Sequence, residues 1–372
     1  MWQRIAAKVE VSKEEQMSPK IEQGKQSKLT KPKSEFNRTF MTLASSWYVA
    51  MESKDLGKKP KAIELFGQPL VAWRDCKGCP IIMNRYCSHM GANLGIGKVV
   101  NGCIQCPFHH WRYDNSGQCV SIPGIEVIPS TAHQVNHATV EKYGYIWVWY
   151  GSETSLFSLP EIFAAENEKH DYIPISRFTL NTKTTVPRLL ENAYDYAHFV
   201  PVHDLKIFQE SIRYTLLYGL QPEQQNELLI PNKFWFGALI EVQLKGYVGI
   251  ASAILHALGL KFEKMTLLVN SWPSGHVIKT LFQDEEILKL MVATTPVDKV
   301  NTMVRISLMV KKTNKFWLNF LYCILFRLQP RASALEDLPV WNTMKPDGGG
   351  SYVEHDYLIL KFREFYQKWI NK

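Results

Sequence analysis

Two short patterns in the chain each place a cysteine close to a histidine. Cys87 and His89 are separated by one residue; 16 residues further on, Cys106 and His109 are separated by two. Turn-forming residues around both patterns predict loops between short strands. Two loops that each offer one thiolate and one imidazole can hold a metal centre between them. These four side chains are therefore candidate metal ligands.

The pairing of ligand types helps to choose between two kinds of metal centre. A structural zinc site can use two Cys and two His, but its common form pairs Cys with Cys and His with His. A Rieske-type [2Fe–2S] cluster binds two Cys on one iron and two His on the other, and the neutral imidazoles raise its potential. The mixed pairs favour the cluster. The Cys-x-x-His spacing favours His109 over the adjacent His110 as a ligand.

A second constellation lies between residues 191 and 203. Glu191, Asp195 and His198 are spaced at i, i+4 and i+7, which predicts one face of a helix. Pro201 should break that helix and let His203 return toward His198. Two imidazoles and one carboxylate form the facial triad that binds non-haem Fe(II) and leaves positions open for O₂.

The third ligand of such a triad has to come from elsewhere in the chain. Taken alone, two histidines near a proline are more often ordinary core residues than metal ligands. A cluster delivers electrons one at a time and needs an acceptor, however, which favours the metal site. Spacing does not choose among the carboxylates of the C-terminal part, which include Glu336, Asp337, Asp347, Glu354 and Asp356.

The elements that must position these residues fall into two groups, separated by a Gly-, Ser- and Pro-containing stretch at 151–160. Before it, apolar and polar residues alternate in short runs, which is typical of antiparallel strands. The run 143–151 is apolar on both faces and predicts a strand buried on both sides. After it, helices are predicted over 186–198 and 355–370. Strands are predicted in 233–249, 265–282 and 288–310.

The apolar run Phe316–Phe326 is about half the ~20 residues that span a bilayer, so it predicts a core helix and no membrane span. Residues 1–45 are rich in Lys, Glu, Gln and Ser and predict a flexible tail. The N-terminus has no continuous apolar segment of the kind that a signal peptide needs. A cytoplasmic protein is therefore expected.

The composition excludes several other classes of protein. The chain has 43 Lys+Arg and 35 Asp+Glu, a net charge of +8 over 372 residues. About half of that charge lies in the first 38 residues, and the remainder is too weak to predict nucleic-acid binding. Seven Cys is an odd and small number, which argues against a disulfide-stapled secreted module.

With both metal patterns present, residues 46–370 resemble the catalytic subunits of Rieske non-haem iron oxygenases. The matching motifs are Cys87-x-His89…Cys106-x-x-His109 for the cluster and Asp195-x-x-His198-x-x-x-x-His203 for the iron. Further stretches resemble the members that oxidise arylamines to nitro compounds: SWYVAM (46–51), GCIQCPFHHWRYD (102–114), YGYIWVWYG (143–151) and MKPDGGG (344–350). Those members also carry the unusual His at position 110.

The resemblance implies an α+β fold with an all-β Rieske [2Fe–2S] domain at 46–152. A mononuclear-iron domain of antiparallel sheet and helices, helix-grip-like, would follow at 153–372. It implies Asp337, in LEDLPVW (335–341), as the third iron ligand, with Glu336 as the nearest rival. It also implies that Asp195 bridges His198 to the partner subunit's His109 in a head-to-tail homotrimer.

The implied activity is oxidation of an apolar aromatic substrate by O₂ and externally supplied electrons, most directly N-oxygenation of an arylamine. No Rossmann-type G-x-G-x-x-G follows a predicted strand. A separate ferredoxin or flavin reductase is therefore expected as the electron donor. Two alternatives stay open. One is a C-hydroxylase, demethylase or desaturase acting on another apolar, steroid-like ring; the other is a Rieske electron-transfer protein.

Overall fold

The structure is a computed structural model of the chain. It describes residues 41–162, 170–217, 234–245, 256–257, 259, 263–327, 329–346 and 348–370. Most of the tail predicted for residues 1–45 lies outside these ranges, as do Asp347 and the ends of the stretch 233–249.

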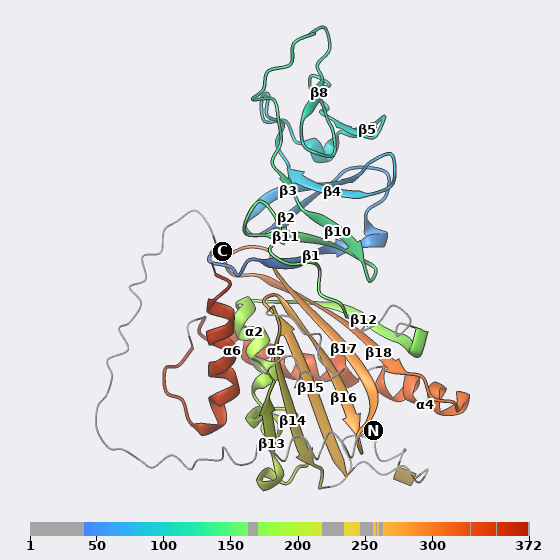
Figure 1. Cartoon of the computed structure of the whole chain (residues 1–372), viewed down its shortest axis with the longest axis vertical. Helices are drawn as coiled ribbons and strands as arrows, with labels where there is room; N and C mark the ends of the chain where they lie inside the picture. Colours follow the sequence, from blue (N-terminus) through green and yellow to red (C-terminus); the bar gives the residue numbers. More distant parts are fainter. Residues whose placement is uncertain are drawn as a thin grey trace. The chain divides into compact units, whose positions relative to one another are not determined.

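Three small antiparallel sheets are formed by residues 46–150 (Figure 1). The first has the order β1 (Ser46–Glu52), β11 (Tyr145–Tyr150) and β10 (Thr139–Lys142). The second has the order β2 (Lys61–Leu65), β3 (Gln68–Arg74), β4 (Pro80–Asn84) and β9 (Asn136–His137). The third has the order β5 (Lys98–Val100), β6 (Cys103–Gln105), β7 (Arg112–Tyr113) and β8 (Cys119–Ser121). Five of the six residues of β11 are buried, which confirms a strand covered on both faces.

A seven-stranded antiparallel sheet follows in the chain. Its order is β12 (Tyr172–Thr182), β18 (Thr302–Lys311), β17 (Glu285–Pro296), β16 (Gly275–Phe282), β15 (Lys264–Trp272), β14 (Phe236–Gln243) and β13 (Arg213–Leu216). The α-helices of this part are α2 (Val186–Glu191), α4 (Phe316–Phe326), α5 (Gln329–Thr343) and α6 (Tyr357–Gln367). Sheets and helices that follow one another in separate segments confirm the α+β class.

Buried polar bonds join the first small sheet to the seven-stranded sheet. Arg305 of β18 donates to the carbonyl oxygens of Val49 (2.9 Å) and Ala50 (3.1 Å) in β1. The Thr295 hydroxyl donates to the same Val49 oxygen at 2.8 Å. Burial lowers the pKa of Arg305 to about 10, so it still carries its charge at neutral pH. Both parts contribute to one hydrophobic core, and the boundary proposed between 152 and 153 stays a prediction.

The prediction of one helix over 186–198 is wrong. Helix α2 ends at Glu191 and is followed by two short 3-10 turns, η5 (Asn192–Tyr194) and η6 (Ala197–Phe199). Asp195 lies between the turns with φ −90° and ψ 90°, an extended conformation. Glu191 and Asp195 therefore do not share a helix face.

Glu191 has a structural position instead. It is buried, and its carboxylate accepts hydrogen bonds from Arg363 of α6 at 2.7 and 2.9 Å. Arg188, one turn earlier in α2, pairs with the same carboxylate. The Arg363–Glu191 ion pair joins α2 to α6. Helix α6 confirms the amphipathic helix that was predicted near the C-terminus.

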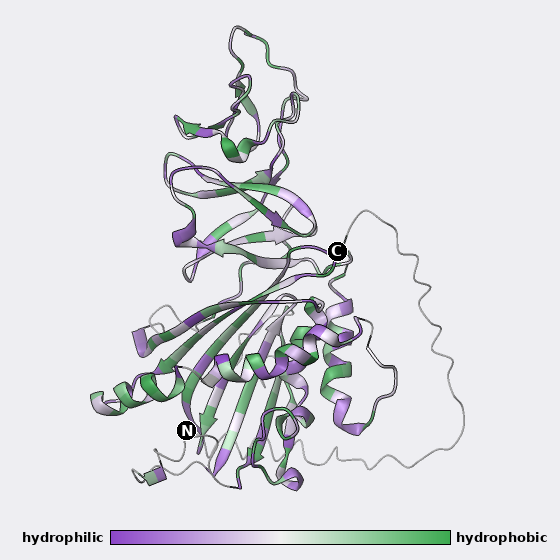
Figure 2. Cartoon of the chain, turned by 180° about the vertical axis from the view of Figure 1, so that it is seen from behind, coloured by the Kyte–Doolittle hydropathy of each residue, from purple (hydrophilic) through white to green (hydrophobic). Residues whose placement is uncertain are grey.

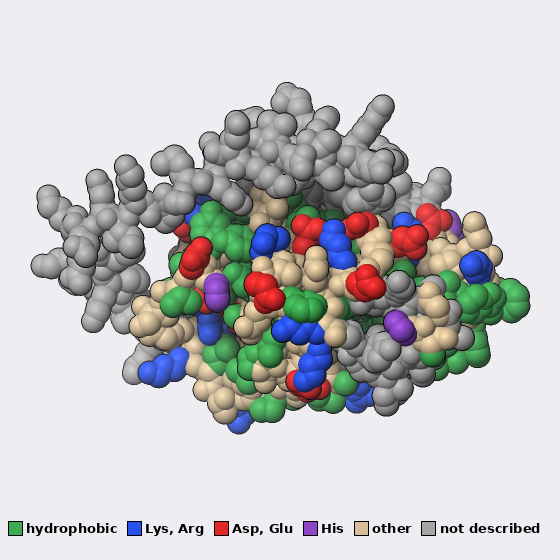
Figure 3. All heavy atoms as spheres, turned by 90° about the horizontal axis from the view of Figure 1, so that it is seen from below, with side chains coloured by type: hydrophobic (Ala, Val, Ile, Leu, Met, Phe, Trp, Pro, Cys, Tyr) green, Lys and Arg blue, Asp and Glu red, His purple; other side chains and the backbone are tan. Residues whose placement is uncertain are grey.

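The apolar run 316–326 forms α4, but only part of it is core. Leu318, Tyr322 and Phe326 are buried, while the opposite side of the helix is exposed. Figure 2 shows α4 as a largely green helix. In Figure 3 green side chains gather at the right edge, the side on which α4 lies in Figure 1. Among the described residues, no helix is both long and apolar enough to cross a membrane.

Acid stability should depend on His276, a buried histidine of β16. Its Nδ1 has no hydrogen-bond partner, and burial lowers its pKa to about 3. The imidazole of His276 has a pKa of ~6.5 in the unfolded chain, so between this pH and about pH 3 it is protonated only when the chain is unfolded. The free energy of unfolding should therefore fall by up to ~1.4 kcal/mol per pH unit in this range. In His276→Gln the melting temperature should therefore fall less between pH 6.5 and 4.5 than it does in the parent protein. Replacement of exposed His133 is the control, and equal acid slopes for both variants would contradict this assignment.

Candidate functional site

Both Cys–His loops are closed in the same way. The first loop follows β4, and the Cys87 amide donates to the carbonyl oxygen of Ala92 at 2.9 Å. The second loop lies between β6 and β7, and the Cys106 amide donates to the Trp111 oxygen at 2.8 Å. In each loop the bond spans five residues. The two loops therefore present their cysteine and histidine from matching backbone frames.

The four candidate cluster ligands converge, with sulfur inside and nitrogen outside. Cys87 and Cys106 are 4% and 1% exposed, whereas His89 and His109 are exposed. The two imidazole rings lie 4.6 Å apart between centroids. Trp111 stacks on His89 at 4.4 Å and an interplanar angle of 4°, which fixes the ring orientation. Two buried thiols beside two accessible imidazoles fit a cluster that exchanges electrons through its histidine side.

Tyr113 belongs to this site, although the sequence patterns did not identify it. Its hydroxyl lies 3.0 Å from Cys87 Sγ and 2.9 Å from Ser88 Oγ. Burial raises the pKa of both Cys87 and Tyr113, so the tyrosine stays protonated and can donate to the sulfur. Its place two residues after Trp111, on the strand that leaves the second loop, is the available sequence signal.

The second constellation gathers into one compact group. One ligand atom each from His198, His203 and Asp337 lies within 4.8 Å of the others. Asp337 Oδ1 is 3.9 Å from His198 Nε2 and 3.4 Å from His203 Nε2. The histidines come from the turns after α2, and the aspartate comes from α5, 134 residues beyond His203. Among the described residues this is the one group of three or more His, Cys, Asp or Glu side chains whose ligand atoms all lie within 4.8 Å of one another, the spacing that suits a single ion.

The two adjacent carboxylates of α5 lie on different sides of His203. Asp337 is 7% exposed and faces both Nε2 atoms. Glu336 is exposed, and its Oε2 lies 2.8 Å from His203 Nδ1, on the far side of the ring. Asp337 is thus placed to share a metal with the two histidines, while Glu336 is placed to orient one of them.

Two further side chains support the group. Asn192 donates to Asp337 Oδ2 at 3.2 Å and lies 3.5 Å from His198 Nε2. Asp195 Oδ2 is 3.8 Å from His198 Nδ1, and its Oδ1 accepts from the Ala197 amide at 3.0 Å. Burial works to raise the pKa of Asp195, but His198 and the backbone hydrogen bonds outweigh it and hold the pKa below the usual range. The sequence patterns did not identify Asn192, which precedes Asp195 by three residues.

The group fits a divalent cation. Burial raises the pKa of Asp337, which shows that its charge is costly at this position without a cation. Its polar partners are the two histidines and Asn192. Buried His198 Nδ1 has no hydrogen-bond partner, and Nε2 faces the carboxylate. Two neutral imidazoles and one carboxylate are the donor set of non-haem Fe(II).

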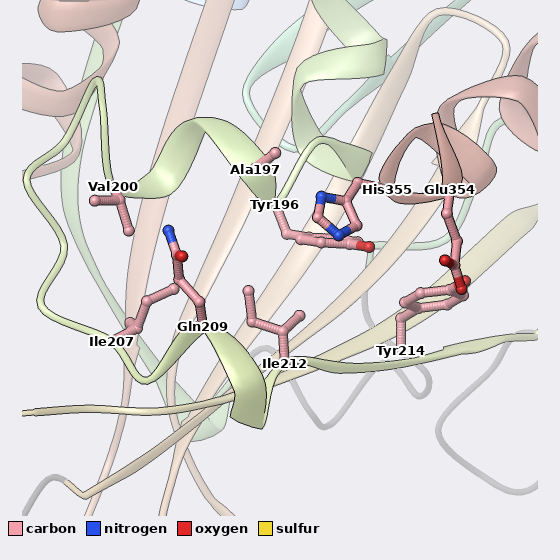
Figure 4. A pocket seen from close by; sticks show the side chains of 9 residues that line it. All are labelled: Tyr196, Ala197, Val200, Ile207, Gln209, Ile212, Tyr214, Glu354 and His355. Carbon is pink, nitrogen blue, oxygen red and sulfur yellow. The ribbon is translucent and has the colours of Figure 1, made fainter. Parts of the chain in front are cut away.

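A cleft of about 300 Å³ is lined in part by the two residues that follow Asp195 in the chain (Figure 4). Tyr196 and Ala197, the next two residues, form part of its wall. Tyr196 stacks on Tyr214 at 5.8 Å between centroids, and His355 lies 5.9 Å from Tyr196. Figure 4 shows these rings together with Ile207, Ile212 and Gln209 around the opening. A partly aromatic cleft therefore follows Asp195 directly in the chain.

Comparison with known proteins gives consistent results. The family model for the Rieske [2Fe-2S] domain matches residues 46–132. Aminopyrrolnitrin oxygenase PrnD of Pseudomonas fluorescens is 42% identical over 89% of this chain and 92% of its own length. Cholesterol 7-desaturase nvd 1 of Ciona intestinalis is 25% identical over 87% of this chain and 68% of its own length.

Solved structures show the same fold. Dicamba monooxygenase bound to 3,6-dichlorosalicylic acid has a TM-score of 0.69 at 17% identity, over 89% of this chain and 98% of that one. NdmA of Pseudomonas putida CBB5 with caffeine has a TM-score of 0.65 at 19% identity, over 86% and 89%. Together with the 42% identity across nearly the whole chain, the two metal-binding constellations lead to one family. This chain belongs to the Rieske non-haem iron oxygenases.

Proposed function

We propose that this oxygenase oxidises the amino group of an apolar arylamine to a nitro group. The observation that carries the proposal is the 42% identity to an aminopyrrolnitrin oxygenase over 89% of the chain. An amine substrate of this kind agrees with the stretches 46–51, 102–114, 143–151 and 344–350, which resemble arylamine-oxidising members. Electrons would come from an external ferredoxin or flavin reductase in the cytoplasm.

The geometry of the two groups supports the following residue roles. Cys87, Cys106, His89 and His109 would hold the [2Fe–2S] cluster; His198, His203 and Asp337 would hold Fe(II). When bound, the cluster supplies electrons one at a time and the iron activates O₂. The protein's own part is to orient and to bridge. Glu336 fixes the His203 ring, Asn192 fixes the Asp337 carboxylate, and Trp111 fixes the His89 ring.

Asp195 is proposed to join the two sites across subunits. Its Oδ2 faces His198 Nδ1, and a third of the Asp195 side chain is exposed at the surface. The aromatic cleft beside it would receive the loop that carries His109 of the partner subunit. A head-to-tail homotrimer, in which each cluster serves the iron of the next chain, is the assembly that this arrangement favours.

Removal of the Tyr113 hydroxyl should lower the reduction potential of the cluster. The hydroxyl lies 3.0 Å from Cys87 Sγ and would donate to a ligating thiolate, and hydrogen bonds to the sulfurs favour the reduced cluster. A bond worth ~1 kcal/mol corresponds to roughly 40 mV for one electron. Tyr113→Phe should therefore shift a spectroscopic redox titration downward by about that amount. The matched control is Tyr143→Phe, which removes a hydroxyl that donates to Glu161. An unchanged potential in Tyr113→Phe would contradict the assignment.

A single turnover tests the proposed substrate class. Pre-reduced, iron-loaded protein is mixed with ¹⁸O₂ and an amino-substituted arylpyrrole, and the products are analysed by mass spectrometry. Labelled hydroxylamine, nitroso or nitro products are expected, and the same arylpyrrole without its amino group should give none of them. If no nitrogen is oxidised although both metals are shown intact, the substrate proposal fails and the family assignment remains.

A second candidate is oxidation of carbon in an apolar ring, as a hydroxylase, demethylase or desaturase. A 3-ketosteroid-9-alpha-monooxygenase oxygenase component of Rhodococcus rhodochrous is 34% identical over 39% of this chain, and a cholesterol 7-desaturase matches 87% of it. The same single turnover with a sterol separates the candidates. Metal analysis tests a pure electron-transfer role, because that role predicts two irons per chain and oxygenation predicts three.

A further inference from the structure

Helix α4 exposes a continuous apolar face. Its four large side chains recur at spacings that place them on one side of the helix. They are Phe316 (83% exposed), Trp317 (45%), Phe320 (68%) and Ile324 (55%). Scattered apolar residues are normal on a protein surface, but four neighbours of this size, three of them aromatic, form a candidate interaction surface.

The opposite face holds the helix in place. Leu318, Tyr322 and Phe326 are 7%, 4% and 5% exposed and belong to one cluster with Leu308 and Val310 of β18. If α4 turned about its axis to bury the outer side chains, it would expose these three residues instead, and the buried apolar area would not increase. The helix is therefore a fixed support for its outer face.

The one amide in α4 is satisfied internally. Asn319 Oδ1 accepts from the Thr313 amide at 2.7 Å and lies 2.9 Å from its hydroxyl, and Asn319 Nδ2 donates to the Thr313 oxygen at 2.9 Å. These bonds pin the segment that leads into the helix. Among the four residues of the outer face, the Trp317 indole N–H is then the one polar side-chain group.

Basic residues lie at both ends of the apolar face. Lys312 and Lys315 precede the helix, Arg327 and Arg331 follow it, and all four are exposed. Residues 311–335 contain five Lys or Arg and no Asp or Glu. Lys311 lies 3.9 Å from Glu286, which offsets its charge.

We propose that this face, defined by Phe316, Trp317, Phe320 and Ile324 with its basic ends, docks on the surface of an anionic lipid bilayer. An 11-residue helix is roughly 16 Å long, too short to span a bilayer but suited to lie in its interface. Aromatic side chains favour the headgroup zone, and the basic ends match anionic headgroups. A protein partner would need an apolar groove with acidic groups at both ends. A lipid surface offers an apolar layer and anionic headgroups over a wide area. The proposal does not depend on which substrate the enzyme oxidises.

Vesicle binding of the full-length holoprotein tests the proposal. Vesicles of phosphatidylcholine with 30 mol% phosphatidylglycerol should bind the protein, as measured by co-sedimentation, and vesicles of phosphatidylcholine alone should bind it at least about tenfold more weakly. The double variant Phe320→Ser/Ile324→Ser should lose at least about tenfold in affinity, because each side chain contributes apolar burial. Lys315→Glu/Arg327→Glu should lose affinity for the anionic vesicles in the same range.

Matched controls use residues of the same kind elsewhere on the surface. Val300→Ser/Val353→Ser removes two exposed apolar side chains, and Lys58→Glu/Lys59→Glu reverses two exposed charges; both should bind as the parent does. Unchanged melting temperatures and iron contents show that the variants are folded. Absence of binding to anionic vesicles would overturn the proposal. So would a change of oligomeric state in Phe320→Ser/Ile324→Ser on sedimentation without vesicles, because the face would then be a contact between subunits.

Discussion

Replacement of Asp337 by Ala is expected to empty the mononuclear site and to lower turnover by more than about 100-fold, since loss of an outer partner of a metal ligand alone costs ~10- to 100-fold. The reason is geometric. Asp337 Oδ1 faces the Nε2 atoms of both His198 and His203, and its buried carboxylate offers the negative charge that the imidazoles lack. Iron per chain by mass spectrometry and single-turnover product yield measure the effect. The visible spectrum of the cluster should be unchanged, because its ligands lie in other loops.

The neighbouring carboxylate supplies the matched control. Glu336 accepts from His203 Nδ1, and Gln can still accept through its amide oxygen, so Glu336→Gln should retain its iron. Glu336→Ala removes the partner and should weaken iron binding by roughly 10- to 100-fold, less than Asp337→Ala. The opposite ranking, with Glu336→Ala iron-free and Asp337→Ala loaded, would exchange the two roles.

Replacement of Asp195 by Asn should leave both metals in place and stop their communication. Asn keeps the oxygen that accepts from the Ala197 amide, so the local turn is preserved. The negative charge that faces His198 Nδ1 is lost, and with it the proposed bridge to the partner subunit's His109. Steady-state turnover should fall by about 10- to 100-fold. Asp204→Asn removes the charge of an acidic side chain that is 81% exposed in the same segment. This control should leave steady-state turnover unchanged.

A mixing experiment separates transfer between chains from transfer within one chain. Cys106→Ser should lack the cluster, and Asp337→Ala should lack the iron. Each preparation alone should be inactive. Assemblies re-formed from a mixture should regain part of the parent turnover, because the cluster of one chain then meets the iron of another. Continued inactivity of the mixture would contradict the bridge between subunits.

The sequence was most informative where chemistry restricts the choice of residues. Cluster ligands need fixed side-chain types at short spacing, so Cys87, His89, Cys106 and His109 could be proposed directly; in the structure the two thiols are buried and the two imidazoles lie side by side. Strand alternation predicted the small sheets for a similar reason, because the side-chain period of a strand is two residues. The central β11 is the exception: it is apolar on both faces, and its short apolar run predicted it instead.

Predictions were weaker where long-range packing decides. The i, i+4, i+7 spacing of Glu191, Asp195 and His198 fits a helix, but Arg363 from α6 takes up Glu191, and the chain turns out of the helix before Asp195. Adjacent Glu336 and Asp337 are equivalent in sequence. They differ because successive residues of α5 point about 100° apart, Asp337 toward the Nε2 atoms of both histidines and Glu336 toward the surface.

Position in the fold also explains the features that sequence patterns missed. Tyr113 and Asn192 are ordinary residue types, and their roles depend on partners far along the chain, 26 residues away for Cys87 and 145 residues away for Asp337. Similarly, the run 316–326 predicts a core helix from its composition alone. Only the placement of α4 over β18 shows that half of that apolar surface has no cover from the described part of the chain.

The buried hydrogen bonds between β1 and the seven-stranded sheet hold these two parts of one chain together. Any movement of β1 away from that sheet would break the bonds from Arg305 and Thr295. If electrons pass between subunits, dilution below the dissociation constant of the assembly would stop turnover without unfolding a chain or releasing a metal. A newly made, unassembled chain would then also not pass electrons from its cluster to O₂ at its iron. Assembly would thus act as a safeguard against futile oxidation while the enzyme is still scarce.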